Sequence, residues 1–276
     1  MVTGVRHSYD RALTDVRTIT ADNNGHYARF ESEICPLVLG LSRQLAAPVE
    51  ARIRSVASRV GLRTAGTSCA ANVTIIIADD GPAVILALRR KMPELFTGLS
   101  GFEIGRLKRE SGPVWNWYSI DPKRRDGAPV EHISQIAFGP SDPPKPVSPH
   151  AYIASNVTLS RLTEPVRLDL ALSFVVINSR AAAGLTLQQL ADASAVLGLS
   201  MINPRRVGEL RSESVLQVLS TSGDVRRRIA GATDFDIRYL SALYSGDSGY
   251  SSDQQAARLA TAIERSNARL ARPAEN

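Results

Sequence analysis

The sequence predicts a mixed α/β protein, with a twisted sheet flanked by helices and a mainly helical C-terminal third. Two observations lead to this fold class. Residues 73–78, VTIIIA, and residues 168–177, LDLALSFVVI, are nearly continuous apolar runs of strand length, which is typical of strands covered on both faces. Segments of helical periodicity separate the strands in the first half, and helices follow one another after residue 185.

Residues 26–120 are predicted to form an N-terminal α/β lobe, after a polar segment, 1–25, that shows no clear pattern. Strands are expected where apolar residues alternate or run together, and helices where they recur every three or four positions. The expected elements of this lobe are a short strand, a helix, a strand, a helix that ends before Pro93, a helix and a strand; the five with clear bounds are 26–30, 42–61, 73–78, 99–110 and 114–120.

A proline-rich stretch, residues 121–149, has no sustained period and is expected to be an exposed loop or linker. Beyond it, residues 150–272 form a C-terminal lobe expected to share one sheet with the first. Its predicted elements are strands at 151–160 and 168–177 and helices at 185–198, 213–220, 233–244 and from Ser251 onward. In the helix at 185–198, Thr186 and Gln189 have capping-box spacing and Gly198 is expected to end the helix.

The stretch TDFDIRYLSALYSGDSG, residues 233–249, contains two acids and a Gly-Asp-Ser-Gly string that also occurs in serine proteases. Thr233 and Asp236 have capping-box spacing, Asp234 can pair with Arg238 one turn later, and both acids suit the first turn of a helix. We therefore interpret the acids as helix caps. The GDSG string joins two predicted helices, without the all-β fold and the His and Asp partners that protease chemistry needs, and we interpret it as a turn.

Asp79 and Asp80 follow the apolar strand at 73–78, where α/β proteins often place chemistry. Capping explains this pair as well, since Asp80 is a good N-cap and Pro82 suits the first helical turn. Trp115 and Trp117 share one face of a predicted strand. We favour a core position for them over a ligand platform.

The net charge of +6 and the pI of about 9.6 invite a nucleic-acid interpretation. However, only four of the 33 basic residues are lysine, and the basic clusters are scattered without stacking aromatics between them. We favour a solvated basic surface. The clusters are at 89–91, 123–125, 205–206 and 226–228.

The location of the protein is left open by the residues themselves. No apolar run reaches the roughly 18 to 20 residues of a membrane-spanning helix, and MVTGVRHSYDRALTDV carries charges where a signal peptide would be apolar. The protein is then cytosolic, or the chain is a mature or trimmed form. Its two cysteines, Cys35 and Cys69, form a disulfide in an oxidising compartment or remain buried thiols in the cytosol.

The histidines offer no metal or nucleophile-activating signature. His7, His26, His132 and His150 are dispersed along the chain, and neither cysteine lies in a known nucleophile motif. No metal ligand, cofactor or catalytic residue can be assigned from the sequence.

Several segments together resemble an uncharacterised family of exported proteins of Gram-negative bacteria. The resemblance spans nearly the whole chain, although each motif is short. It implies an exported protein in which Cys35 and Cys69 form a disulfide, and a chain from which a signal peptide has been removed. The motifs are HYARFESEICPLVLGL, SCAANVTIIIADD, RRKMPELFTGLS, VVINSRAAAGLTLQQLADASAV and TDFDIRYLSALYSG.

The closing motif also resembles domains of unknown function related to zincin-like metallopeptidases. Those enzymes carry H-E-x-x-H on a helix that follows the sheet. The corresponding helix here, 186–197, reads TLQQLADASAVL, and no H-E-x-x-H occurs anywhere in the chain. The resemblance therefore implies the scaffold without the zinc site or the peptidase activity.

We expect a non-catalytic exported module, periplasmic or secreted, that binds an unidentified protein partner or cell-envelope component on a degenerate hydrolase-like scaffold. One alternative is a hydrolase in which acids converge in a cleft, the candidates being Asp79, Asp80, Asp234 and Asp236. A weaker alternative is nucleic-acid binding through the arginine clusters. The sequence favours a protein without catalytic activity, and a cytoplasmic location remains the alternative to export.

Overall fold

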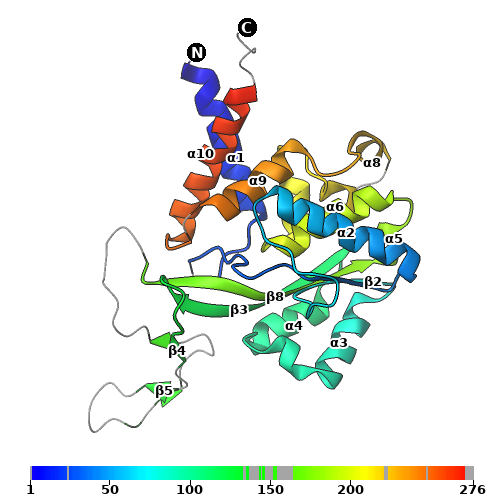
Figure 1. Cartoon of the computed structure of the whole chain (residues 1–276), viewed down its shortest axis with the longest axis vertical. Coiled ribbons are helices and arrows are strands. Elements are labelled where there is room, and N and C mark those ends of the chain that lie inside the picture. Colours follow the sequence, from blue (N-terminus) through cyan, green and yellow to red (C-terminus); the bar gives the residue numbers. More distant parts are fainter. Residues whose placement is uncertain are drawn as a thin grey trace.

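A four-stranded sheet lies at the centre of the protein (Figure 1). We describe a computed structural model, which covers residues 2–23, 25–132, 135–136, 143, 145–146, 152–153, 164–220, 223–246 and 248–270. The strand order is β1 (Pro36–Leu39), β2 (Val73–Ala78), β8 (Val166–Asn178) and β3 (Val114–Arg124). β1, β2 and β8 are parallel, and β3 is antiparallel to β8. The predicted mixed α/β class is confirmed.

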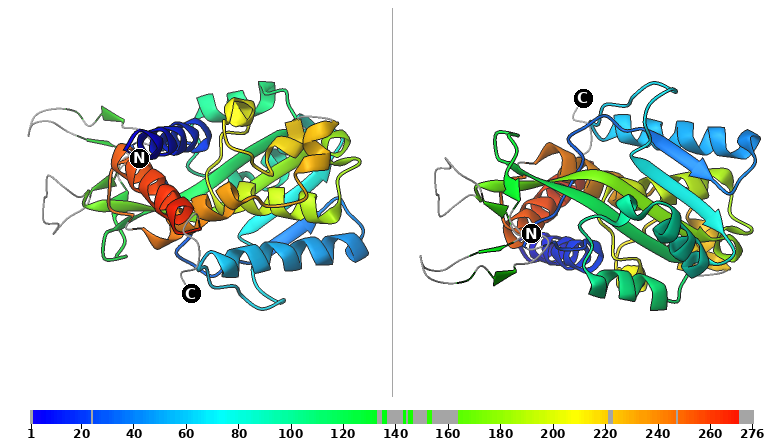
Figure 2. Two further views of the ribbon diagram at one scale, coloured as in Figure 1. Left: turned by 90° about the horizontal axis from the view of Figure 1, so that it is seen from above. Right: turned by 90° about the horizontal axis from the view of Figure 1, so that it is seen from below.

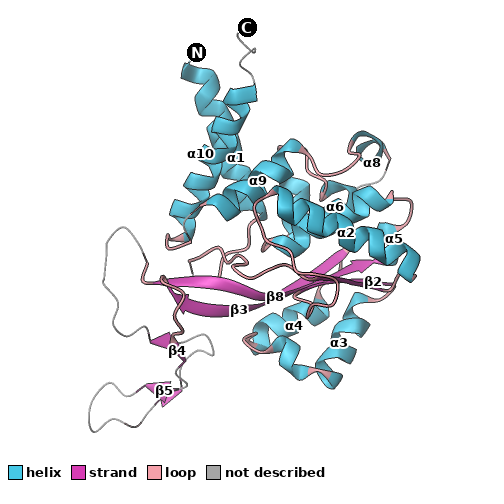
Figure 3. Ribbon diagram, in the orientation of Figure 1, coloured by secondary structure: helices cyan, strands magenta, loops and turns pink. Residues whose placement is uncertain are grey.

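Helices cover both faces of this sheet (Figures 1 and 3). One face carries α3 (Gly81–Lys91), the 3-10 helix η1 (Pro93–Phe96) and α4 (Gly101–Arg109). The other carries α2 (Arg43–Arg59), α6 (Leu187–Leu199) and α9 (Asp234–Ser245). The remaining helices are α1 (Val2–Ile19), α5 (Ser179–Ala182), η2 (Pro204–Glu209), α7 (Gln217–Ser220), α8 (Asp224–Arg228) and α10 (Ser252–Leu270).

The two halves of the chain contribute to the same sheet, because β8 from the second half lies between β2 and β3 from the first. Figure 2 shows β8 crossing the middle of the molecule, with β3 along one edge. Between β3 and β8 the chain also forms two short antiparallel pairs, β4 (Glu131–His132) with β7 (Tyr152–Ile153) and β5 (Gln135–Ile136) with β6 (Lys145–Pro146). The loop expected at 121–149 begins later than predicted, because residues 121–124 continue β3. Twelve of the 29 residues of this stretch, and most of the strand expected at 151–160, lie outside the described residues.

The N-terminal segment, in which the sequence showed no pattern, is helix α1, and it packs beside α10. From His7 onward its buried side chains are Ala12, Asp15, Val16, Thr18 and Ile19, and Ala12, Asp15, Val16 and Ile19 have helical spacing. The pattern is obscured in the sequence because two of these buried residues, Asp15 and Thr18, are polar. The Asp15 carboxylate accepts hydrogen bonds from the backbone amides of Arg211, at 2.9 Å, and Ser212, at 3.1 Å.

Three further expectations about individual elements need correction. Gly198 lies inside α6 and does not end it, because a Cβ at this position would come within 2.6 Å of Val73 Cγ1; glycine is there for close packing on β2. The helix expected at 213–220 is only Gln217–Ser220. Residues 26–30 add to the sheet through a single parallel bridge, in which Arg29 exchanges backbone hydrogen bonds with Leu168 and Leu170.

The two tryptophans occupy the core beneath α3 and α4, as favoured. Trp117 stacks between Phe96, at a centroid distance of 5.1 Å, and Phe174, at 5.0 Å. The indole N–H of Trp115 donates to the carbonyl of Glu110 at 2.9 Å, and that of Trp117 donates to Leu95 at 3.2 Å. Both rings are therefore structural.

Helix α6 is buried on every side, since each residue from Gln189 to Leu199 is shielded from solvent. Its one charged side chain, Asp192, is fully buried and makes a two-pronged ion pair with Arg52 of α2, at 2.6 and 3.1 Å. Asp192 also accepts from the amide of Ala232 at 2.8 Å. At the start of the helix, the predicted capping box of Thr186 and Gln189 is present. The buried helix is thus anchored through specific polar contacts.

Tyrosine hydroxyls donate hydrogen bonds to the backbone carbonyls at the carboxyl end of α6. Tyr118 of β3 donates to the carbonyl of Ser200 at 3.1 Å, and Tyr244 of α9 donates to that of Leu199. Nearby, the hydroxyl of Tyr239 hydrogen-bonds to that of Thr20, directly after α1, at 3.0 Å. These contacts join β3, α9 and the end of α1 around one helix terminus.

Cys35 and Cys69 form a disulfide, with Cα atoms 6.0 Å apart. It links the segment before β1 to the segment before β2. Among the described residues, no helix has the length and apolarity that crossing a membrane requires.

We predict that replacing both cysteines, Cys35→Ser with Cys69→Ser, lowers the free energy of unfolding by about 4 kcal/mol, because the unfolded chain gains the freedom of the closed loop. Urea denaturation followed by circular dichroism measures the change. Reduced wild-type protein is the control and should lose a similar amount. A double variant as stable as the oxidised wild type would show that the disulfide does not support the fold.

We also predict alkaline destabilisation. Burial raises the pKa of Tyr239 from 10.0 to about 12, so above pH 10 the unfolded chain releases this proton while the folded chain retains it. The resulting stabilisation is complete below pH 10 and is lost as the pH rises through 12. Each such tyrosine should lower the free energy of unfolding by about 1.4 kcal/mol per pH unit in this range. Urea titrations from pH 9 to 12 test this, and a flat profile would contradict it.

Candidate functional site: a cleft beside the edge strand

The first pair of acids proposed from the sequence, Asp79 and Asp80, lies exposed at the end of β2. Asp80 caps α3 as predicted, accepting from the amide of Ala83 at 2.9 Å. Asp79 accepts from the hydroxyl of Ser179 through its side chain, and its backbone carbonyl accepts from Asn178 Nδ2 at 2.9 Å. This pair joins the beginnings of α3 and α5 to the end of β2.

The second pair, Asp234 and Asp236, begins α9, and the predicted capping box of Thr233 and Asp236 is present. Asp236 is buried, and its carboxylate accepts from the Ser214 hydroxyl at 2.5 Å and from the Val215 amide at 2.8 Å. Burial raises the pKa of Asp236, and these hydrogen bonds oppose the rise. Asp234 is exposed and pairs with Arg238 at 3.1 Å. All four acids therefore have structural partners.

The histidines and the arginine clusters do not assemble into a site. Within the described residues, no group of three or more His, Cys, Asp or Glu side chains is placed to hold a metal ion. His26 is buried and His7 is exposed, whereas the His132 side chain and His150 are not described. The four basic clusters lie on separate elements, at the end of α3, at the end of β3, at the beginning of η2 and within α8. Several of their members form ion pairs: Lys123 with Asp121, Arg124 with Asp126, Arg205 with Glu110, Arg206 with Glu209, and Arg227 with Asp224.

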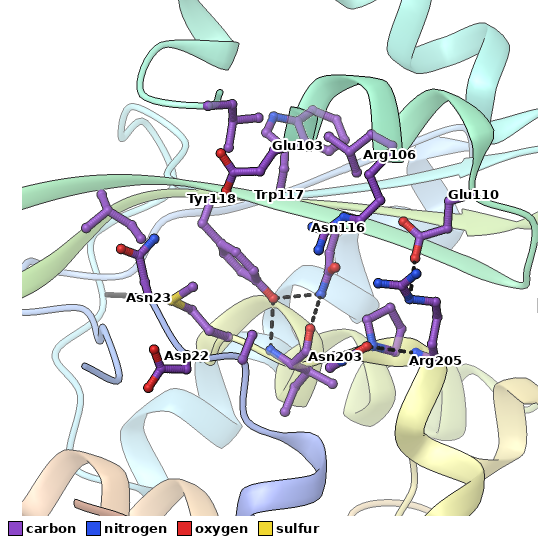
Figure 4. Close-up of a pocket in the computed structure, with 17 residues that line it drawn as sticks. Asp22, Asn23, Glu103, Arg106, Glu110, Asn116, Trp117, Tyr118, Asn203 and Arg205 are labelled. Carbon is purple, nitrogen blue, oxygen red and sulfur yellow. Dashed lines mark hydrogen bonds and ion pairs between the residues drawn. The ribbon is translucent and has the colours of Figure 1, made fainter. Parts of the chain in front are cut away.

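A different set of residues forms a cleft beside β3 (Figure 4), with a volume of about 120 Å³. One wall comes from α4 and the residues that follow it, and the other from residues 201–205 and from residues 21–23 after α1. None of the four acids discussed above lines it. Its polar lining consists of Asp22, Asn23, Glu103, Arg106, Glu110, Asn116, Tyr118, Asn203 and Arg205.

The floor of the cleft is a fixed hydrogen-bond network. Asn116 Nδ2 donates to the Tyr118 hydroxyl at 2.7 Å and to the carbonyl of Ile202 at 2.7 Å. The amide of Ile202 donates to the same tyrosine hydroxyl at 3.0 Å, and that hydroxyl donates in turn to Ser200. Figure 4 shows Tyr118 and Asn116 pointing toward one another from β3. Both side chains are locked by the contacts that also hold the end of α6.

The rim of the cleft carries charged groups, most of them with partners. Glu110, only 7% exposed at its side chain, pairs with Arg205 at 3.0 Å. Glu103 is held by the capping box with Ser100, and Asp22 accepts from the amide of Gly25 at 2.8 Å. Arg106 of α4 is exposed, and its guanidinium has no hydrogen-bond or ion-pair partner in the part of the chain that the structure describes.

Two other hollows are larger but bring together fewer polar groups that could recognise a ligand. One, of about 350 Å³, lies between α9 and α10, and its acid and one of its arginines are the paired Asp234 and Arg238. The other, of about 290 Å³, is lined by residues of α1, α9 and α10, with Arg238 again among them. The cleft beside β3 brings together polar groups from more elements, over a floor whose hydrogen bonds are satisfied.

Sequence reasoning missed this cleft. Arg205 was noted only as part of a basic cluster, and Glu110 and Arg106 only as parts of a helix. One signal was available: Asn116 is a polar residue between two tryptophans on a strand whose both faces are covered, and a buried amide needs specific partners. The identity of those partners depends on the tertiary fold.

Comparison of the chain with models of known protein families, with curated proteins and with solved structures found no match. The geometry of the cleft and the chemistry of its residues therefore carry what can be inferred about function.

We predict that Tyr118→Phe lowers the free energy of unfolding by about 1 to 3 kcal/mol, because the buried amide of Ile202 and the side chain of Asn116 lose their acceptor. Urea denaturation measures the effect. Tyr250→Phe is the matched control: the Tyr250 ring packs under the guanidinium of Arg258, 3.8 Å from its centroid, and phenylalanine keeps that contact. Equal effects of the two substitutions would contradict the role assigned to the Tyr118 hydroxyl.

Proposed function

We propose that this chain is an exported, non-catalytic binding module that takes its ligand in the cleft beside β3. The observation that carries the proposal is which polar groups of the cleft already have hydrogen-bond or ion-pair partners. The floor is a completed hydrogen-bond network, and Arg106 on the rim is a cation that has no partner within the described ranges. Such an arrangement suits recognition of an anionic group by a rigid surface. Proton transfer or nucleophilic attack would instead need a base and a nucleophile aimed at an open position.

Export is supported by the disulfide between Cys35 and Cys69, because disulfides form and persist mainly in the periplasm and outside the cell. The resemblance to exported bacterial proteins points to the same compartments. We keep the zincin-related scaffold as part of the proposal, with α6 in the place of the helix that would carry the metal ligands.

The rival functions have less support. A hydrolase acting through Asp79, Asp80, Asp234 or Asp236 would need carboxylates free to act, and each of these acids already serves a helix start or an ion pair. Nucleic-acid binding would need a continuous basic face. The arginine clusters lie on separate elements, and several of their charges are neutralised by acids.

Native mass spectrometry of untagged protein from its own host tests the proposal. We expect the mass of an oxidised chain without bound metal, alone or in a complex that dissociates on denaturation. Alkylation without reductant should leave both cysteines unmodified. A stoichiometric metal ion would contradict a non-catalytic module, and two alkylated thiols would contradict export.

A further inference from the structure

The outer side of β3 carries backbone groups that have no strand to bind. In an antiparallel pair, residues alternate between those whose N–H and C=O face the partner strand and those whose groups face away. The amide of Asn178 donates to the carbonyl of Pro113 at 2.8 Å. Because the register continues without a shift up to Ser119, Trp115 and Trp117 bind β8, and the backbone groups of Asn116 and Tyr118 face outward.

This open edge coincides with the cleft. β3 is the last strand of the sheet. Farther along it the edge is closed, because the amide of Arg124 donates to the carbonyl of Ala128 at 2.7 Å and Lys123 forms a bridge with Pro129. The cleft is lined by Asn116, Trp117, Tyr118 and Ile120, so the stretch that remains unpaired in the described structure borders the cleft. The side chains at 116–118 are buried, and Asn116 and Tyr118 are 8% and 9% exposed against 2% for Trp117, as expected if only their outward backbone groups reach the cleft.

The opposite edge of the sheet, strand β1, is covered by a side chain. On β1, the amide of Val38 donates to the carboxylate of the buried Glu50 at 3.1 Å, so a side chain occupies a position where another strand could bind. Covering edges in this way prevents unwanted strand addition. At β3 the edge instead faces a cleft with polar walls, and this difference favours a binding role for it.

We propose that the partner is an extended peptide segment of another protein, which adds to the edge of β3 and places an acidic side chain against Arg106. This inference rests on the proposed binding function. Strand addition draws affinity from main-chain hydrogen bonds and specificity from alternate side chains. A volume of about 120 Å³ is below the roughly 300 to 1,000 Å³ of small-molecule pockets, which argues against a drug-sized ligand enclosed in the cleft and favours a partner that lies along its open edge. The unpaired guanidinium selects a carboxylate over a cationic side chain.

The experiment selects binders from a library of random seven-residue peptides displayed on phage, with the oxidised full chain as target. The enriched peptides are synthesised and titrated into labelled protein. We expect them to contain an aspartate or glutamate. On binding, hydrogen exchange of the Asn116 and Tyr118 amides should slow by at least about tenfold, while that of the Trp115 and Trp117 amides, already bound to β8, stays unchanged.

Two sets of variants separate the contributions of charge and main chain. Arg106→Ala should weaken binding by about tenfold, as expected for loss of one charge-assisted hydrogen bond. Arg109→Ala is the matched control, since Arg109 is exposed on the same helix and does not line the cleft; it should bind like the wild type. Methylating the peptide amides that face β3 should abolish binding, and methylating the alternate amides should not.

Three outcomes would overturn the inference. Peptides that bind without protecting Asn116 and Tyr118 would place the binding site elsewhere, and the proposed function would stand. Protection that increases with protein concentration in the absence of peptide, together with a dimer in sedimentation, would show that a second copy occupies the edge. Failure to enrich any peptide would exclude peptide addition, and the function would then be decided by the native mass spectrum.

Discussion

Helix α6, buried from Gln189 to Leu199, determines how the other elements must pack, because its polar groups need partners from distant parts of the chain. A helix leaves amides at its start and carbonyls at its end without internal partners. The exposed start of α6 is closed by the capping box of Thr186 and Gln189, whereas its carboxyl end is buried and needs partners from the protein. The buried side chain of Gln189 donates to the carbonyls of Arg226 and Ile229, at 2.6 and 2.7 Å. Tyrosines from β3 and α9 bind the carbonyls at the end of the helix. Partners far apart in the sequence must therefore be in place together, which ties the two halves of the chain into one unit.

The same constraint explains why the candidate site has a rigid floor. Tyr118 serves two purposes, because its hydroxyl binds the carbonyl that follows α6 and also accepts from Asn116 and from the amide of Ile202. The cleft thus takes its shape from the core, and its loops have little freedom to rearrange. A preformed surface of this kind loses little conformational entropy on binding. Arg106, whose guanidinium has no partner among the described residues, stands on α4, at the other side of the edge strand.

The parts of the fold that were predictable are those encoded locally. The apolar run of β2 and the capping boxes at Thr186 and Thr233 identify a buried strand and two helix starts within a few residues each. Helix α1 was missed because Asp15, on its buried face, interrupts the apolar stripe, and its partners are the amides of residues 211 and 212. Gly198 was misread as a helix end because its close contact with Val73 is a tertiary feature. The cleft could not be predicted, since Asn116, Arg106 and Arg205 meet only when β3, α4 and η2 pack together.

Native-state hydrogen exchange of the α6 amides shows whether this helix holds the two halves of the chain together. If the burial of α6 holds the two halves together, its amides from Ala191 to Leu199 should exchange only through global unfolding, with the same free energy and denaturant dependence as the central strand β8. Amides of α6 that exchange through a smaller opening, while β8 stays protected, would contradict the account. They would show that the helix docks on a sheet that is stable without it.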